Sequence, residues 1–168
     1  MSQNCYAYAI QYPHTIDPGE LSGRKYRDNS DNELISASQA DGLQFTGSTT
    51  MPGLQPGSYI VALIATSADR SNYHWLRRES DSTWSHKPGQ ANPQKRDATE
   101  TPIDDGNPPH RANFNYRAFF MSTAKRQQLL GVAEAQGWAL DYDRFVGYFY
   151  CPDIGLQPRK KKGECNLL

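Results

Sequence analysis

The sequence predicts an α+β fold, in which a short N-terminal helix packs against a small antiparallel sheet. Three observations carry this prediction. Residues 58–66 are apolar, β-branched and aromatic, as expected of a buried central strand. Two more candidate strands, 73–78 and 83–87, follow it and flank a short polar loop, which indicates a hairpin. At the N-terminus, Asn4 is a good helix cap, and Pro13 ends the helix after roughly two turns.

The other elements follow from turn signals and periodicity. A short helix over residues 33–40 ends at Gly42, and a loop with two Pro-Gly turns leads into the central strand. In the second half we expect a surface excursion over 90–113, a strand over 114–121, a helix over 123–136 capped by Ser122, and a buried strand over 145–151. The predicted organisation is one domain over residues 1–157, followed by a flexible tail over 158–168.

Composition excludes several classes of protein. The 168 residues suffice for one domain with a real core, and 37% hydrophobic residues with a mean hydropathy of −0.78 indicate a soluble chain. No run approaches the ~18 apolar residues of a membrane span. No basic segment followed by an apolar one begins the chain, so we expect no Sec signal. A net charge of zero argues against general nucleic-acid binding.

Cysteines and acidic residues give no sign of a metal or cofactor. The three cysteines are odd in number and scattered, so they predict neither a disulfide framework nor a zinc site, and a reducing compartment is expected. Asp104, Asp105 and His110 lie close in sequence, but their spacing fits no familiar metal site. We therefore expect no metal and no cofactor.

Cys5 is the first candidate for chemistry. If Asn4 caps the helix, Cys5 occupies its first position, where the positive end of the helix dipole lowers the pKa of a thiol and favours the nucleophilic thiolate. The competing interpretation is a buried structural cysteine, which is common. We interpret Cys151, at the end of an apolar strand, in that structural way.

Two histidines in the predicted hairpin are the second candidate feature. If the hairpin is centred near Ser80, His74 and His86 are symmetric about it and face one another, with Cβ atoms ~5 Å apart. A register slip of one residue would put them on opposite faces of the sheet. The alternative is that one or both are hydrogen-bonded structural histidines.

A cysteine nucleophile needs a base within hydrogen-bond reach and a third group that orients the base. The order Asn4-Cys5, Pro56-Gly57, His74 and His86 resembles the papain-like cysteine peptidase superfamily, especially its compact Cys-His-His branch, which includes bacterial cell-wall endopeptidases. The resemblance covers roughly residues 4–90. It implies a papain-like core and a thiol hydrolase, a protease or an amidase, with Cys5 as nucleophile, His74 as base, His86 as orienting group and no cofactor.

The chain departs from that pattern in two respects. The helix after Cys5 is short because Pro13 intervenes, and no obvious glutamine precedes Cys5 to complete an oxyanion hole. The backbone N–H of Cys5, with a neighbouring donor, would have to stabilise the oxyanion. The histidines could also exchange roles, with His86 as the base and either His74 or Asp41 orienting it.

The C-terminal tail carries a different signal. Cys165 is fourth from the end and is followed by Asn, Leu and Leu, which fits the prenylation pattern, and the final leucine favours a geranylgeranyl group. One lipid anchors a protein stably only with a second signal, and a basic cluster just upstream supplies it for an anionic membrane surface. That cluster consists of Arg159, Lys160, Lys161 and Lys162. The competing interpretation is a basic tail with a chance cysteine.

Together these features predict an effector. A bacterial-type thiol hydrolase with a eukaryotic lipidation signal would reach a host cell by a non-Sec route and be modified by a host prenyltransferase. It would then act on a host protein at the cytoplasmic leaflet; without the lipid it would be cytoplasmic. One alternative is deamidation, transglutamination or acyl transfer by the same triad. Another is a non-enzymatic, prenylated binding module recruited to membranes.

Overall fold

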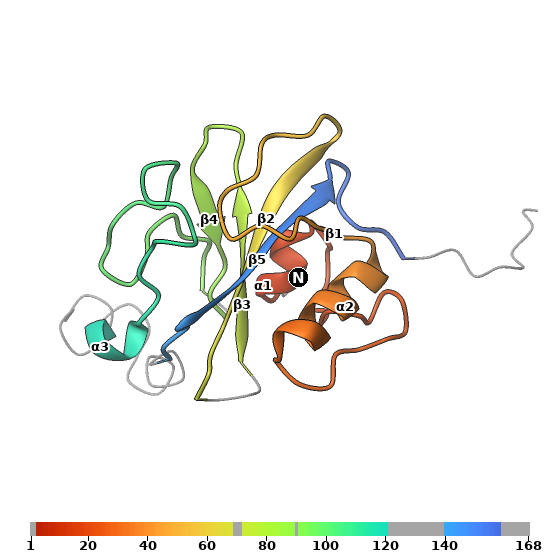
Figure 1. Ribbon diagram of the computed structural model, residues 1–168, viewed down its shortest axis with the longest axis horizontal. Coiled ribbons are helices and arrows are strands. Elements are labelled where there is room, and N and C mark those ends of the chain that lie inside the picture. Colours follow the sequence, from red (N-terminus) through yellow and green to blue (C-terminus); the bar gives the residue numbers. More distant parts are fainter. Residues whose placement is uncertain (1–2, 69–71, 90, 121–139, 159–168) are drawn as a thin grey trace, which may run out of the picture.

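The computed structural model describes residues 3–68, 72–89, 91–120 and 140–158. Within them the chain has an α+β fold built on a five-stranded, entirely antiparallel sheet (Figure 1). The elements are α1 (Cys5–Ala9), α2 (Asp31–Asp41), β1 (Gln44–Phe45), β2 (Ser58–Ala65), β3 (Tyr73–Arg78), β4 (Trp84–His86), α3 (Tyr116–Phe120) and β5 (Arg144–Pro152). None of the helices among these residues is long and apolar enough to cross a membrane.

The strands are arranged in the order β1-β5-β2-β3-β4, so β2 lies at the centre, as its sequence predicts. The C-terminal strand β5 inserts between β1 and β2 and pairs with β2 along its whole length. The short strand β1 was not predicted, because its two residues are too few to show a periodic pattern.

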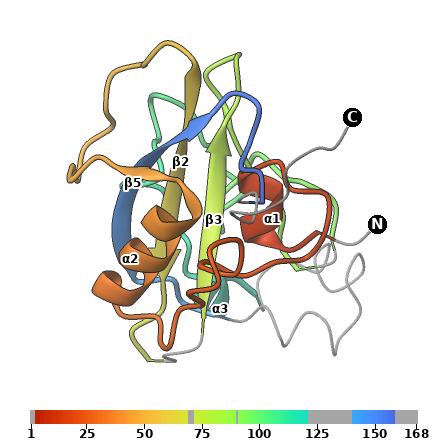
Figure 2. The same cartoon turned by 90° about the vertical axis from the view of Figure 1, so that its right-hand side faces the viewer.

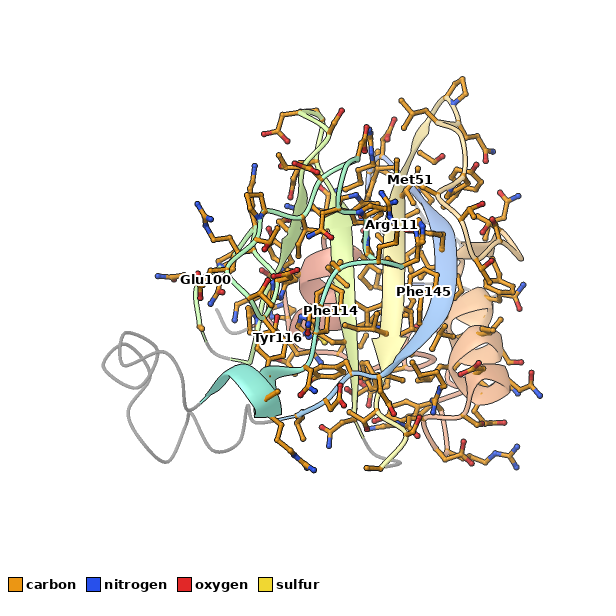
Figure 3. All side chains as sticks on the ribbon, turned by 60° about the vertical axis from the view of Figure 1, so that its left-hand side comes forward. Met51, Glu100, Arg111, Phe114, Tyr116 and Phe145 are labelled. Atoms are coloured by element: carbon orange, nitrogen blue, oxygen red, sulfur yellow. The ribbon has the colours of Figure 1, made fainter. Side chains whose placement is uncertain are left out.

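Alternation along β2 divides the core between the two faces of the sheet. Val61, Leu63 and Ala65 face α1 and α2, and form one buried cluster with residues such as Tyr6. Ile60, Ala62 and Ile64 point to the other face, where they pack under the long excursion. Figure 3 shows that excursion, through Arg111, Phe114 and Tyr116, crossing the front of the sheet, with α1 behind it.

The predicted strand over residues 114–121 is wrong, because Tyr116–Phe120 is a helix. The side-chain oxygen of Asn115 accepts a hydrogen bond from the backbone N–H of Ala118 at 3.0 Å, which is the contact of a helix N-cap. This local contact prevails over the apolar pattern that indicated a strand. The predicted helix over 123–136, with its cap Ser122, lies outside the described residues.

Candidate active site

The N-terminus of α1 fixes the position of Cys5. Asn4 is extended, and its side-chain oxygen accepts from the Ala7 backbone N–H at 2.9 Å, so the predicted cap is confirmed. The amide nitrogen of the same side chain donates to the Ile16 carbonyl at 2.8 Å and to Asp17 at 3.3 Å. The Asn4 side chain therefore joins the start of α1 to the loop that follows the helix. Cys5 is the first residue of α1, directly after this cap.

The thiol of Cys5 is less acidic than the helix-dipole argument predicts. Burial raises its pKa to about 11, and backbone N–H groups of Trp75 and Tyr6 within reach of the sulfur only partly oppose that effect. The negative charge of Asp17 raises the pKa further. Desolvation prevails here because α1 has only five residues and the sulfur sits among packed side chains. At neutral pH the resting group is a thiol.

The two histidines lie on the same face of the hairpin, although the predicted register is wrong. His86 pairs with Leu76, so the hairpin is centred on residue 81 and not near Ser80. The shift moves the pairing by two positions, which preserves the face of each side chain. His74 and His86 are diagonal neighbours, with Nε2 of His74 2.8 Å from Nδ1 of His86 and the two rings perpendicular.

A backbone carbonyl sets the direction of the proton chain through these rings. Nε2 of His86 lies 2.9 Å from the carbonyl oxygen of Arg96, which can only accept, so this nitrogen donates. In the uncharged pair, Nδ1 of His86 then accepts from Nε2–H of His74. His74 is left with an unprotonated Nδ1, as a general base requires.

This arrangement favours one of the two role assignments. His86 uses both ring nitrogens within the relay, so it suits an orienting role, whereas His74 keeps a nitrogen for chemistry. Asp41, the other orienting candidate, instead accepts hydrogen bonds from the Tyr6 hydroxyl and from the backbone of Gly19 and Ser22. It fixes the loop after α1.

His74 is a neutral base. Burial holds the pKa of its imidazole well below the usual range, and the neighbouring His86 shifts that pKa in the same direction. The ring of Tyr142 stacks against the His74 ring at 5.5 Å and contributes to this burial. A base that remains unprotonated at neutral pH is able to accept the proton of a thiol.

Cys5 and His74 share the wall of one cavity of about 240 Å³. Figure 2 shows the arrangement that brings them together, with α1 lying beside β3. The cavity is otherwise walled by amide, aromatic and apolar residues and carries no charged side chain among those described: Asn4, Asn72, Tyr73, Pro88, Gly89, Tyr116, Leu140 and Tyr142.

The remaining candidates have structural surroundings or lie outside the described residues. Cys151 is fully buried in the core, where burial raises its pKa to about 12. His110 is hydrogen-bonded to the Tyr148 hydroxyl at 2.7 Å, and no cluster of three or more His, Cys, Asp or Glu side chains among the described residues could hold a metal ion. The basic residues 159–162 and Cys165 lie outside the described part of the chain.

Two components of the site were missed in the sequence. The Arg96 carbonyl is a backbone group, and nothing in the residue type marks it. Tyr142 is 68 positions from His74 in the chain and reaches it only because β5 returns to the sheet centre. A signal for Tyr142 would have required knowledge of the strand order.

Comparisons with known proteins give one similarity. The chain is 35% identical over 105 residues to a protein named insoluble matrix shell protein 1 from Ruditapes philippinarum. The aligned part covers 61% of this chain and 66% of that protein, so the chain spans just under two thirds of the length of the relative. No family model and no solved structure matches the chain. The name of the relative describes a matrix protein and says nothing of thiol or histidine chemistry.

Proposed function

We propose that the chain is a thiol hydrolase with a papain-like core, a protease or an amidase that uses Cys5, His74 and His86. One observation carries the proposal: the relay from the Arg96 carbonyl leaves Nδ1 of His74 unprotonated, and His74 and Cys5 line the same cavity. Burial keeps the imidazole of His74 neutral. A buried polar nitrogen without a hydrogen-bond partner costs folding free energy, so packing alone would favour an apolar side chain at this position.

The mechanism begins from a neutral thiol and a neutral imidazole. Nδ1 of His74 takes the thiol proton as the Cys5 sulfur attacks the carbonyl carbon of an amide, forming the C–S bond. The oxyanion is stabilised by backbone N–H groups at the start of α1, where the first N–H groups of a helix have no intrahelical partner. The Ala7 N–H is already taken by Asn4, so the N–H groups of Cys5 and Tyr6 are the candidates.

Collapse of the tetrahedral intermediate breaks the C–N bond. His74 returns its proton to the leaving amine, and a thioester remains on Cys5. Water, deprotonated by His74, then attacks the thioester and releases a carboxylic acid, while the sulfur recovers its proton. During both steps His86 accepts the Nε2–H of His74 and stabilises the imidazolium that forms.

The test compares two thiols in one molecule. Alkylation by iodoacetamide, followed by mass spectrometry, is measured at Cys5 and at Cys151 in wild type, His74→Ala and His86→Ala. The proposal expects Cys5 to react much faster than Cys151 near neutral pH and to lose that advantage in His74→Ala. Equal rates at Cys5 and Cys151 in the folded wild type would reject the enzyme.

Transfer and deamidation remain alternatives within the same chemistry. Deamidases, transglutaminases and acyltransferases share the thioester and differ in what donates or resolves it. Adding a primary amine to the reaction distinguishes them, because a transferase forms the new amide and a hydrolase releases the acid.

A second candidate is a non-enzymatic matrix component. The similarity to an insoluble matrix shell protein favours this candidate. If the chain is such a matrix component, Cys5 should be unreactive towards iodoacetamide. The Cys5→Ser variant should then assemble as the wild type does. The alkylation experiment therefore separates the two candidates directly.

We also propose prenylation of Cys165, supported by the sequence of the tail alone. In that case the protein would lie at an anionic cytoplasmic leaflet, held by the lipid and by the basic residues 159–162. A host prenyltransferase and a host protein substrate would be its partners after delivery by a non-Sec route. Incubation with geranylgeranyltransferase and its lipid donor, with Cys165→Ser as control, tests the modification by intact mass.

A further inference from the structure

Lys87 places a cation next to two residues that line the cavity. It follows His86 at the end of β4 and precedes Pro88 and Gly89, both of which line the cavity. Its side chain is partly buried and turns back over this segment, where Nζ donates to the Gly89 carbonyl at 2.7 Å. The ammonium is therefore fixed beside the cavity by a contact with the wall itself.

This cation has no acidic partner among the described residues. Lys87 forms no ion pair there, and the charge with which it interacts is that of the Cys5 sulfur when ionised. Burial lowers the pKa of Lys87, because no carboxylate compensates the desolvation of its ammonium. The contact with Gly89 uses one of the three ammonium donors and leaves the net charge unneutralised.

Lys25 provides the contrast to Lys87. Its ammonium binds Asp17 at 2.8 Å and Glu20 at 3.3 Å, so its charge is matched. Asp17, which raises the pKa of Cys5, also accepts from the Tyr73 hydroxyl at 2.8 Å. The charges of Lys25, Asp17 and Glu20 form a compensated group, whereas the charge of Lys87 has no such compensation among the described residues.

We propose that the site selects substrates that carry a carboxylate close to the reacting carbonyl, and that Lys87 binds this carboxylate. The inference rests on the thiol-hydrolase proposal in one respect, that Cys5 is the reacting group. The described cavity walls carry no charged side chain, so the discrimination by charge depends on Lys87 at their edge. A carboxylate is the anion that a peptide substrate offers, either as an acidic side chain or as a free C-terminus.

The experiment uses two nearly isosteric alkylating agents, iodoacetate and iodoacetamide, which differ in a carboxylate and a carboxamide. Their rate ratio at Cys5 is divided by the ratio for glutathione, which removes the intrinsic difference between the reagents. In wild type we expect the corrected ratio to favour iodoacetate by about threefold to tenfold, as expected of one charge acting through a partly screened site. Lys87→Gln should abolish the preference and Lys87→Glu should reverse it.

Lys95→Gln is the matched control, because it removes a lysine whose charge is paired with Asp81 at 3.1 Å, and neither residue lines the cavity. It should leave the corrected ratio at the wild-type value. A ratio that is the same in wild type and Lys87→Gln would overturn the inference. An equal slowing of both reagents in Lys87→Gln would overturn it as well, since Lys87 would then only stabilise the thiolate.

The same assay separates this inference from the proposed function. The ratio is measurable even if Cys5 reacts slowly, whereas the function is rejected by the absolute rate and its dependence on His74. The source of the carboxylate is tested by protection against iodoacetamide. Acetyl-glutamate amide represents an acidic side chain, a dipeptide with a free C-terminus represents the chain end, and their neutral amides are controls. The stronger protector identifies the source, and protection by neither overturns the subsite.

Discussion

Cys151 belongs to a buried cluster of the core and the partly buried Cys5 packs against the same cluster, yet their surroundings differ in one decisive respect. Burial raises the pKa of both thiols, to about 11 for Cys5 and about 12 for Cys151. Their acidities alone would make both inert at neutral pH. Cys5 differs because it shares a cavity with an imidazole whose free nitrogen is unprotonated.

If Cys5 is the proposed nucleophile, this comparison predicts that its reactivity depends on a proton acceptor and not on a depressed thiol pKa. Transfer of the proton to His74 creates opposite charges next to one another, and their attraction compensates part of the cost that burial imposes on each. A helix of five residues contributes too little to lower the pKa of the thiol by itself. The base is therefore the component whose loss should matter most.

Replacing His74 should make Cys5 resemble Cys151. In His74→Ala we expect the alkylation rate of Cys5 at pH 7.5 to fall by about a thousandfold, the middle of the range for loss of a general base. The pH profile distinguishes the cause. In wild type the reacting form has a protonated thiol and an unprotonated imidazole. This form predominates from neutral pH up to the Cys5 pKa of about 11, so the alkylation rate should be nearly independent of pH over that range.

Without the base, the rate should instead rise about tenfold per pH unit until the thiol ionises near the pKa of about 11. Stopped-flow or quenched alkylation with mass spectrometry gives both profiles. Circular dichroism shows whether the variant remains folded. A profile in wild type that already rises steeply through neutral pH would contradict transfer of the thiol proton to His74.

Replacing His86 should have a smaller effect. His86→Ala removes the acceptor that orients His74, and we expect a loss of about tenfold to a hundredfold in the rate at Cys5. His86→Asn is the matched variant, because its side-chain oxygen also accepts from an N–H donor. Partial recovery by asparagine, with an unchanged rate at Cys151, would show that the contact orients the base; equal losses in both variants would show that His86 acts by packing.

The sequence predicts these residues better than it predicts the contacts between them. The strands near 58–66, 73–78, 83–87 and 145–151 and the Asn4 cap follow from local patterns, and these predictions are confirmed, unlike the strand over 114–121. The hairpin centre was misplaced by one residue, since Glu79 N–H donates to the Thr83 carbonyl and Ser82 adopts a positive φ of 67°. A turn of this kind depends on local hydrogen bonds that composition does not reveal.

The pH dependence of stability gives a further test of the neutral base. The folded-state pKa of His74 lies below its value in the unfolded chain, so the unfolded state binds more protons once the pH falls below about 6.5. Stability should be constant above that pH and fall by about 1 kcal/mol per pH unit below it. His110 contributes in the same direction, because burial also lowers its pKa.

Denaturant unfolding at several pH values measures this slope. His74→Phe should reduce the slope, since phenylalanine fills the site without titrating. His110→Phe should remove only the contribution of His110 to the slope. A slope below pH 6.5 that is unchanged in His74→Phe would mean that folding does not lower the pKa of His74. Burial would then not be what keeps His74 a neutral acceptor beside Cys5.

The smallest expected effect is that of removing the Asn4 cap, which tests whether the helix start or the base determines the reactivity of Cys5. Asn4→Ala removes the N-cap and the contact with the Ile16 carbonyl, and should lower the free energy of unfolding by about 1 kcal/mol. Asn4→Ser keeps a cap and loses only the amide donors, so it should cost less. Both variants leave His74 in place, and the rate at Cys5 should fall by less than about tenfold because the acceptor, not the cap, activates the thiol. A loss as large as that of His74→Ala would assign the reactivity to the helix start instead.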